Sequence, residues 1–488
     1  MQRTAIQKAP LALILVIYLV LGGAYALYTP LWQVPDEPAH FNYIKYIAEH
    51  GQLPELKPGD YPHDYLEEIK ARRFPPTMSI EPIRYEAHQP PLYYLLAAPI
   101  YLVAERTFSP PLVPLVLRFF SLFLGALSLF AGYKTIRTLW PSQMPLAIGT
   151  VAFAATLPMH VAMNAGINND VLIELIINLT AWQLAKTPLA KMSPRHAAGL
   201  GILLGLAFLT KMQAFIVLGM ILVLLAWDAH ETTKTSSPRY HICLLFGVAL
   251  ALTAPWLIRN ALVYGPRDLL ALKRHDQVVV GQLTTKEFLS MHNYIELLRH
   301  FVQTTFQSFW GQFGWMGVPL DQRIYLALFL LCCWVAIGVG AKSMRLLHEH
   351  RFPSRRLVLL ASWILITVAG YLWYNTKYLQ PQGRYLFAAI IPLGLIFTIG
   401  LQECVSRASR LCTFIFGALA GGLFLSGLFL GDIKGYTFII ALGLALLAPL
   451  GSALERLKSG LFIFLFYLGM AGFTLFCLWF YVVPHLSP

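Results

Sequence analysis

Charged side chains are scarce in this chain. Asp, Glu, Lys and Arg together make up 12% of its 488 residues, whereas hydrophobic residues make up 57%, and the mean hydropathy is +0.60. A soluble domain of this length covers itself with many more charged groups, so the composition excludes a soluble protein. It predicts an all-α polytopic membrane protein, because a helix satisfies its own backbone hydrogen bonds inside lipid.

Several patterns that carry chemistry are missing as well. The six cysteines lie in apolar segments or at their ends and have no metal-ligand spacing. They therefore predict neither a disulfide framework nor thiol chemistry. The sequence also has no phosphate-binding loop and no dinucleotide fingerprint.

Apolar runs recur along the whole chain. About thirteen of them approach or exceed the roughly 20 residues that a membrane-spanning helix needs. They cover residues 11–28, 112–133, 145–163, 168–186, 197–211, 213–229, 241–262, 324–341, 357–375, 385–402, 411–430, 436–453 and 460–483. The first run ends like a signal peptide, with Ala24-Tyr25-Ala26, but its length favours an anchor that is not cleaved.

One further apolar segment does not fit this series. Residues 90–105 are apolar, but a full span there would invert every later helix and place the basic loops outside. We therefore expect a helix that lies at the outer surface or dips into it. A true span with inverted topology is the alternative.

The positive charge has a definite location. The net charge is +13, and with a cytoplasmic N-terminus the excess falls in cytoplasmic loops, which carry residues such as Lys134, Arg195 and Arg356. An excess of Lys and Arg on the inner side is the rule for membrane proteins. The charge therefore predicts an integral protein of the cytoplasmic (inner) membrane, and it gives no reason to invoke nucleic acid.

Two long loops concentrate the polar residues of the predicted outer face. The first, residues 29–89, is rich in acids, histidine and proline, and the second, residues 263–323, contains an amphipathic stretch that suits an interfacial helix. We divide the chain into four parts on this basis. These are 1–262, a catalytic transmembrane module that includes outer loop 29–89 and interfacial helix 90–105; 263–323, an outer loop with an amphipathic helix; 324–402, transmembrane helices that carry Gln382-Gly383-Arg384-Tyr385; and 403–488, C-terminal transmembrane helices.

An acidic pair follows the first apolar run directly. Asp36 and Glu37 stand within Pro35-Asp36-Glu37-Pro38-Ala39-His40, where the first helix leaves the lipid. Charge near hydrocarbon is costly, so such a pair is usually kept for a task at the membrane surface.

Further ionisable residues occur near the outer ends of predicted helices. Asp170 and Glu174 are four residues apart and therefore share one face of a helix. The cations are Arg118, Lys211, Arg259 and Arg384. Each of them alone could snorkel to the surface or lock the bundle. Together, at one depth beside Asp36, they predict a pocket for a phosphate-bearing lipid whose tail stays in the membrane.

The order of these motifs resembles that of the GT-C membrane glycosyltransferases, especially the branch of protein O-mannosyltransferases and lipid A aminoarabinose transferases. The resemblance covers the chain from about residue 10 to about residue 400. It rests on Asp36-Glu37 with His40, Glu86-Ala87-His88-Gln89-Pro90-Pro91, Arg118, Asn169-Asp170, Leu209-Thr210-Lys211, Pro255-Trp256 with Arg259-Asn260, and Gln382-Gly383-Arg384-Tyr385. It implies a GT-C-like fold of about 13 transmembrane helices with a large first outer loop that carries interfacial helices.

The resemblance also implies roles for individual residues. Asp36 matches the first-loop aspartate that acts as, or orients, the catalytic base, and Asp170 matches a second acid beside it, with Glu37 as a further catalytic carboxylate. The residues that would bind the donor phosphate are Lys211, Arg259, Arg384 and Arg118. The residues that would bind or orient the substrate are His40, Glu86, His88, Gln89 and Tyr385. Gln89 occupies a position that is basic in the family, so His88 or another cation would have to replace its phosphate contact.

These roles predict an inverting glycosyltransferase that moves a sugar from a polyprenyl-phosphate carrier to an acceptor on the outer face. A carrier phosphate already leaves readily, so the reaction needs positive charge near the departing phosphate and a base for the acceptor. The expected partners are membrane lipids, an undecaprenyl- or dolichyl-type donor, and an acceptor that is a protein, a glycolipid or a polymer.

Three alternatives remain open at this point. A divalent cation could be held by Glu37, His88 and Asp170. A flippase or transporter of lipid-linked sugars would also explain charges within the membrane, although the paired repeats typical of transporters are missing from the sequence. A non-catalytic scaffold that has lost its activity is the third alternative.

Overall fold

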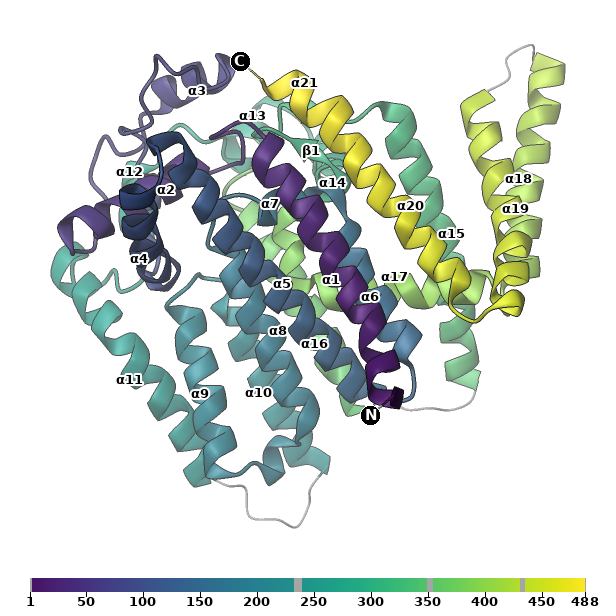
Figure 1. Cartoon of the computed structure of the whole chain (residues 1–488), viewed down its shortest axis with the longest axis horizontal. Coiled ribbons are helices and arrows are strands. Elements are labelled where there is room, and N and C mark those ends of the chain that lie inside the picture. The colour runs from purple at the N-terminus through teal and green to yellow at the C-terminus, as the bar shows by residue number, and fades with distance from the viewer. Residues whose placement is uncertain (1, 232–238, 349–353, 431–434, 488) are drawn as a thin grey trace.

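The computed structural model describes residues 2–231, 239–348, 354–430 and 435–487. These residues form a helical bundle with shorter helices gathered at one end (Figure 1). The first elements are α1 (Gln2–Tyr28), α2 (Glu37–His50), α3 (His63–Ala71), η1 (Tyr85–His88), α4 (Leu92–Thr107), η2 (Pro110–Leu112), α5 (Val113–Leu139), α6 (Met144–Thr156), α7 (Pro158–Asn164), α8 (Asp170–Lys186), η3 (Leu189–Lys191), α9 (Pro194–Phe208), α10 (Ala214–Glu231) and α11 (Arg239–Tyr264).

The remaining elements follow the same all-helical pattern, apart from two strands of two residues each that pair in antiparallel fashion. They are α12 (Leu272–Val278), α13 (Thr285–Met291), α14 (Tyr294–Trp310), β1 (Gln312–Phe313), β2 (Val318–Pro319), α15 (Gln322–His348), α16 (Arg355–Asn375), η4 (Gly383–Ala389), α17 (Ile390–Cys404), α18 (Ser409–Leu430), α19 (Gly435–Leu457), α20 (Leu461–Cys477), η5 (Leu478–Val482) and α21 (Val483–Leu486). The predicted class, an all-α polytopic membrane protein, is confirmed.

The number of membrane spans differs from the expectation. Ten helices among the described residues are long and apolar enough to cross a membrane, and the bent pair α6–α7 raises the number to 11. The expected number of about thirteen is therefore not confirmed. The two other expected spans correspond to α8 and α9, which have 17 and 15 residues and fall short of the roughly 20 residues of a full crossing.

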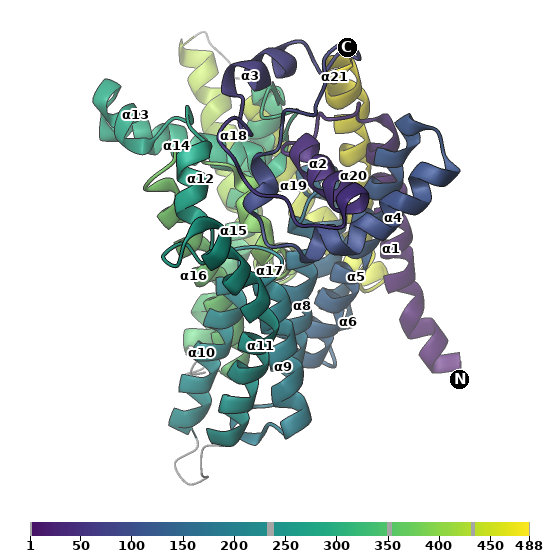
Figure 2. The same cartoon turned by 90° about the vertical axis from the view of Figure 1, so that its left-hand side faces the viewer.

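The shorter helices gather at the end of the bundle opposite the N-terminus. There α2, α3 and α4 share one end of the molecule with α12, α13 and α14 (Figures 1 and 2). Helix α4 corresponds to the apolar segment 90–105, and it packs against α2 rather than qualifying as a candidate span. Both long loops of the sequence thus contribute to the same end of the molecule.

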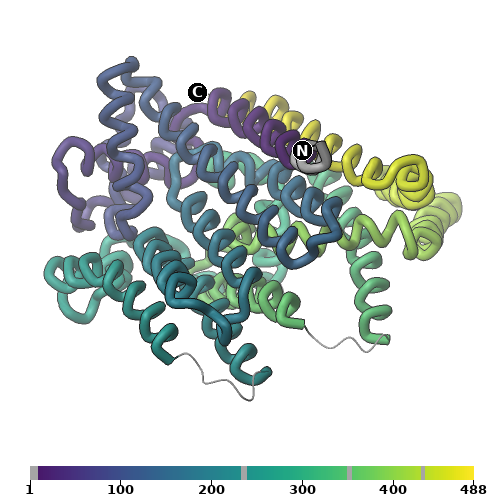
Figure 3. Tube along the Cα trace, turned by 60° about the horizontal axis from the view of Figure 1, so that its bottom comes forward, coloured from purple at the N-terminus to yellow at the C-terminus, as the bar shows by residue number. Residues whose placement is uncertain are grey.

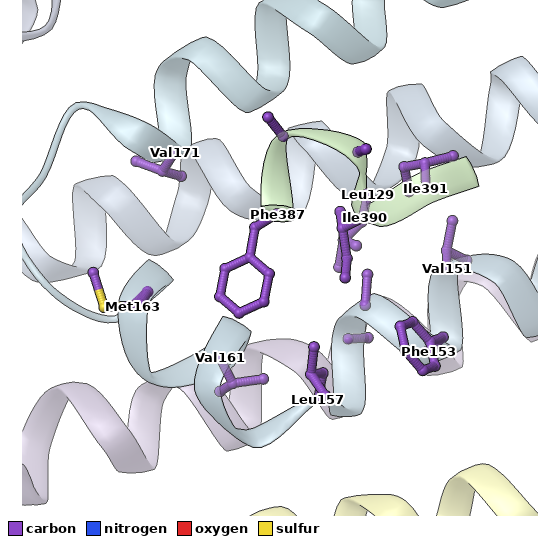
Figure 4. Packing of buried hydrophobic residues seen from close by; sticks show 14 of the residues in the cluster. Leu129, Val151, Phe153, Leu157, Val161, Met163, Val171, Phe387, Ile390 and Ile391 are labelled. Atoms are coloured by element: carbon purple, nitrogen blue, oxygen red, sulfur yellow. The ribbon is translucent and has the colours of Figure 1, made fainter. Parts of the chain in front are cut away.

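One helix of the bundle is broken inside the apolar core. Helices α6 and α7 meet at an angle of 68° around Leu157. Figure 4 shows Phe387 of η4 pointing toward this break, near Val161. The break and η4 therefore meet in the middle of the core, close below the end that carries the shorter helices.

The last helices extend the bundle sideways. Helices α18 and α19 pack against each other and stand at one side of the molecule (Figures 1 and 3). Helix α20 returns along α1 and α6. The polar features described below all lie in the larger part of the bundle, away from the α18–α19 pair.

Candidate functional site

Asp36 stands at the N-terminus of α2 in an unusual backbone conformation. Its φ is 68° and its ψ is −5°, which is the left-handed region. A residue other than glycine pays about 1–3 kcal/mol for a sparsely populated backbone conformation, and such residues cluster at functional sites. The carboxylate accepts hydrogen bonds from Tyr85 Oη at 2.7 Å and from Arg384 Nη2 at 2.8 Å.

The electrostatic environment keeps Asp36 ionised. Burial alone would raise its pKa, but the Arg384 guanidinium, His40 and the Tyr85 hydroxyl outweigh burial and lower the pKa of Asp36 to about 2. The side chain is still 25% exposed. Asp36 is therefore a charged, partly accessible group with a cation bound on one side.

Asp170 and Lys211 form a second ion pair of the same kind. Asp170 is the first residue of α8, where the helix dipole favours a negative charge. Lys211 follows the end of α9 and donates to Asp170 Oδ1 at 2.7 Å. The two side chains are 31% and 18% exposed.

A small cavity brings the two pairs together. Its volume is about 20 Å³, and Asp170 and Arg384 both contribute to its lining. Arg384 therefore contacts Asp36 on one side and faces Asp170 on the other. The structure thus brings together Asp36, Asp170, Lys211 and Arg384, four of the residues expected to share one pocket. We refer to these four residues as the charged quartet.

The position of Arg384 depends on close packing at the start of η4. A Cβ atom on Gly383 would come within 2.4 Å of the Phe309 backbone nitrogen, so only glycine lets η4 approach α14 this closely. The Gly383 amide donates to Ser308 Oγ at 2.7 Å. Arg384 Nε in turn donates to Gln382 Oε1 at 2.6 Å, which fixes the guanidinium from the side away from Asp36.

Tyr385, the last residue of this motif, faces a different group. Its hydroxyl donates to Gln380 Oε1 at 3.0 Å. Its ring lies 5.3 Å from the Arg384 guanidinium carbon, within the range of a cation–π contact. Tyr385 thus supports Arg384.

Glu37 and Arg118 form a separate, sealed pair. Arg118 Nε and Nη2 donate to the two Glu37 oxygens at 2.7 and 2.6 Å, and neither side chain is exposed. Glu37 also accepts from the amides of Trp32 and Ile167. Arg118 also donates to backbone carbonyls in the last turn of α1 and in the segment that follows it. The structure therefore joins these two residues to each other and to the backbone around Asp36.

The histidine–proline segment lies on the other side of Asp36. Glu86 is 9% exposed, and its Oε2 has no hydrogen-bond partner. Burial raises the pKa of Glu86, while nearby His40 opposes this. His40 is buried, and its Nδ1 lies 2.9 Å from Tyr94 Oη. Burial lowers the pKa of His40, while the carboxylates of Glu86 and Asp36 oppose this.

His88 and Gln89 point to different neighbours. His88 Nδ1 donates to the Tyr85 carbonyl at 2.9 Å, and its ring lies 4.5 Å from that of His275 in α12. Burial lowers the pKa of His88 to about 4. Gln89 Oε1 accepts from Asn169 Nδ2 at 3.4 Å, so Gln89 lies beside the start of α8.

Arg259 makes its contacts with the first outer loop. Its Nη2 donates to the Pro54 carbonyl at 2.5 Å, and its guanidinium lies 5.2 Å from the rings of Trp256 and Tyr264. These contacts tie α11 to the loop after α2. They do not connect Arg259 to the charged quartet.

Within the described residues, no group of three or more His, Cys, Asp or Glu side chains is arranged to hold a metal ion. Two of the three suggested ligands already have other partners. Glu37 is bound by Arg118, and Asp170 is bound by Lys211. The side chains present therefore do not form a ready site for a divalent cation, and no step below depends on one.

Some residues of the site carry no assignment from the sequence. Tyr85 binds Asp36, but it is one of 23 tyrosines, and nothing in the sequence distinguishes it. Gln382 orients Arg384, and its place in the Gln-Gly-Arg-Tyr motif was the available signal. His160 lies in the broken helix beside Glu174, and a lone histidine inside an apolar run was the signal for it.

Comparison with known proteins gives a family match over part of the chain and a shared fold. Residues 88–258 match the family described as dolichyl-phosphate-mannose-protein mannosyltransferase. The structure is similar to that of ArnT from Cupriavidus metallidurans in the apo state, with a TM-score of 0.55 and 14% identity over 98% of this chain and 77% of that one. For ArnT bound to undecaprenyl phosphate, the TM-score is 0.51 with 15% identity over 96% and 77%. No curated protein sequence matches the chain.

Proposed function

We propose that this chain transfers a sugar from a polyprenyl-phosphate carrier to an acceptor at the outer face of the cytoplasmic membrane, because residues 88–258 match a mannosyltransferase family and the fold is similar to that of ArnT. The observation that carries this proposal is the charged quartet. It consists of two ion pairs, Asp36 with Arg384 and Asp170 with Lys211, and Arg384 and Asp170 line one small cavity between them.

The cations of the quartet suit a departing phosphate. When the bond from the anomeric carbon to the phosphate oxygen breaks, the carrier phosphate gains a second negative charge. Lys211 and Arg384 are 18% and 10% exposed, so their charges act in a medium that screens less than water. Fixed positive charge at the place where negative charge grows is usually the largest contribution to catalysis.

Asp36 suits the role of base for the acceptor. A general base accepts the proton of the attacking hydroxyl or amine as the new bond to the sugar forms. With a pKa of about 2, Asp36 is a weak base while Arg384 holds it. A carrier phosphate that shares Arg384 would weaken this hold, so donor binding would make Asp36 more basic. Attack from the face opposite the phosphate inverts the anomeric centre.

The sealed pair supports this base without touching substrate. Glu37 and Arg118 bind each other, the backbone of the segment that precedes Asp36, and the Ile167 amide, and both are fully buried. We assign them a positioning role, in which they hold the left-handed backbone at Asp36. Glu86, His40 and Gln89 stay proposed substrate contacts, because they lie between Asp36 and the start of α8.

The test is sugar transfer by membranes that contain the wild-type chain or the Asp36→Asn variant. The donor is a set of radiolabelled polyprenyl-phosphate sugars, and the acceptors are those already present in the membranes. Loss of a general base lowers a rate by about 10²–10⁴-fold, so we expect a loss of this size. Asp64→Asn, a change at an exposed carboxylate of the same loop, should leave transfer unchanged.

Two results would count against the proposal. Full transfer by Asp36→Asn would remove Asp36 from the reaction. Movement of the labelled carrier across vesicles by the wild-type chain, without any sugar transfer, would favour the flippase.

A further inference from the structure

A second group of polar side chains lies inside the bundle, below the charged quartet. His160 Nε2 lies 3.0 Å from Glu174 Oε2, and Ser128 Oγ donates to Glu174 Oε1 at 3.0 Å. Asn178 Nδ2 donates to Ser128 Oγ at 2.7 Å, and Asn164 Nδ2 lies 3.2 Å from His160 Nε2. We call these five residues the inner polar cluster. All five are buried, and the proposed transfer reaction does not use them.

The break between α6 and α7 explains why a histidine stands here. In a continuous helix the Ala154 carbonyl would accept from the amide four residues later, but that residue is Pro158, which has no N–H. His160 Nδ1 donates to the Ala154 carbonyl instead, at 2.8 Å. Nδ1 therefore carries a hydrogen, and this leaves Nε2 facing Glu174.

A path of polar groups joins this cluster to the charged quartet. Asp170 and Glu174 lie on one face of α8, and both line the cavity that Arg384 reaches. A cavity of about 20 Å³ has room for one water, since about 10–15 Å³ suffices. Gln213 Oε1, in the same lining, is buried and has no hydrogen-bond partner, so it offers an acceptor to such a water.

A purely structural role does not account for this arrangement. An imidazole–carboxylate pair inside a bundle is expensive to desolvate, and apolar side chains of similar volume often stabilise as well or better. Ionisable groups within membrane spans therefore mark ion or proton pathways by default. The break at Leu157 adds a second sign, because interrupted helices in membranes are tolerated where they line a cavity or site.

We propose that Glu174 and His160 form a proton-accepting site that is loaded when the carrier phosphate in the charged quartet carries its second negative charge. This inference rests on the proposed function for its place in the reaction. It adds to that function a group that neither the family match nor the motif order assigns.

The proton balance of the transfer step gives the site its role. The acceptor oxygen or nitrogen forms a bond to the anomeric carbon, and the electron pair of the broken bond stays on the phosphate. The acceptor proton passes to Asp36 and then, by way of Asp170 and the cavity water, to Glu174 and His160. The pair gains one positive charge as the phosphate gains one negative charge, so the net charge within the site does not change.

The surroundings of the pair restrict where the proton can go. The ionisable groups that face it are Tyr18 of α1 on one side and, across the cavity, Asp170 and Arg384, with Lys211 beside Asp170. Ser128, Asn164 and Asn178 contribute hydrogen bonds but do not titrate near neutral pH. Asp170 is thus the carboxylate that links the pair to the quartet.

The experiment counts protons when purified protein binds undecaprenyl phosphate. Calorimetric titrations in two buffers of different ionisation enthalpy give the number of protons taken up per carrier bound. They are run at about pH 8, where a phosphate monoester is already dianionic because its second pKa is about 6. We expect about one proton per carrier for the wild-type chain and for Asp36→Asn, and none for Glu174→Gln or His160→Gln.

The matched control is Thr135→Val. Thr135 Oγ1 donates to the Asn178 carbonyl in the same bundle, so its loss disturbs packing near the cluster without removing a proton-accepting group. Thr135→Val should take up protons as the wild-type chain does. If one of the two cluster variants does not fold, the other and the wild-type titration still decide the question.

Three outcomes would overturn the inference: no proton uptake by the wild-type chain, equal uptake by the wild-type chain and both cluster variants, or loss of uptake in Thr135→Val as well. A wild-type chain that takes up a proton with the carrier but transfers no sugar would instead count against the proposed function. The two failures are therefore distinguishable.

Discussion

Two consecutive carboxylates of this chain, Asp36 and Glu37, are each bound by an arginine but differ in what remains open. Glu37 has both oxygens occupied by Arg118 and by backbone amides, and no part of it is exposed. Asp36 has one tyrosine and one arginine as partners and is 25% exposed. The same residue class one position apart is thus built into the fold in one case and left available in the other.

The difference indicates how the fold can keep one carboxylate accessible beside another that is fully buried. A buried ion pair with every donor and acceptor satisfied fixes the backbone rigidly, because either partner alone would be an unpaired charge in a medium of low dielectric. That rigidity allows the neighbouring residue to hold a left-handed conformation and an incompletely surrounded carboxylate. The sealed pair, Glu37 with Arg118, therefore supports the open pair, Asp36 with Arg384.

The largest effect is expected when the sealed pair is broken. Arg118→Met would leave the Glu37 carboxylate buried without a cation, which typically destabilises a protein by about 3–5 kcal/mol. Thermal unfolding of the purified protein should show a strongly lowered midpoint. Arg384→Met is the matched comparison on the open side, where Asp36 can still be hydrated, so its midpoint should change much less. Equal midpoints for the two variants would contradict the distinction between the pairs.

For the rate of sugar transfer, Arg384→Met should be the variant with the large direct effect. Arg384→Met removes a positive charge from the place where the leaving phosphate gains its second negative charge, and the loss of one such group lowers a rate by about 10²–10³-fold. The measurement is kcat/KM for transfer from a radiolabelled polyprenyl-phosphate sugar. Arg384→Lys keeps the charge but not the two-pronged geometry, so it should recover part of the rate. A fully active Arg384→Met would remove the arginine from the proposed mechanism.

The open pair also depends on close backbone packing. In Gly383→Ala the new methyl group would lie 2.4 Å from the Phe309 nitrogen, and forced overpacking costs about 1–3 kcal/mol. Displacement of η4 from α14 would move Arg384, so transfer should fall about tenfold for each 1.4 kcal/mol of transition-state stabilisation lost.

Gly370→Ala in α16 is the control for this change. It meets nothing within 4 Å, and replacement of a helical glycine by alanine is stabilising by up to about 1 kcal/mol. Unfolding midpoints and transfer rates of the two alanine variants should therefore diverge. Normal transfer by Gly383→Ala would show that Arg384 does not need the close contact between η4 and α14.

The membrane class could be predicted because lipid imposes simple rules on sequence. Hydropathy and the location of basic residues are read directly from the chain. The order of short motifs pointed to the GT-C glycosyltransferases, and the family match over residues 88–258 and the fold shared with ArnT agree with that resemblance. The number of spans was harder to predict. Helices α8 and α9 are apolar but short, and α6–α7 is broken at a proline, so run length alone overestimates how many helices cross the bilayer.

The candidate site could be predicted as a set of residues but not as a set of contacts. Asp170, Lys211 and Arg384 lie at helix ends in one part of the bundle, and helix geometry is enough to bring such ends together. Whether a carboxylate is sealed or open depends on tertiary partners, and sequence spacing does not reveal that Arg118 reaches Glu37 rather than Asp36. Arg259 shows the same limit, since its contact with Pro54 depends on the path of a loop.

The smallest effect concerns pH and tests whether the contact between His88 and α12 excludes water as the structure indicates. His88 and His275 lie with their rings 4.5 Å apart, and burial, reinforced for His275 by His88, lowers the pKa of each to about 4. An unfolded histidine has a pKa of about 6.5, so between about pH 6.5 and about pH 4 the unfolded chain binds more protons than the folded one. Stability should therefore be lost as the pH falls through this window.

Unfolding midpoints measured between about pH 6.5 and about pH 4 should decline less steeply for His275→Gln than for the wild-type chain. His50→Gln, at an exposed histidine of α2, is the control and should leave the slope unchanged. An identical slope for His275→Gln would mean that water reaches this pair, and that the open side of the site is wetter than its partner distances imply.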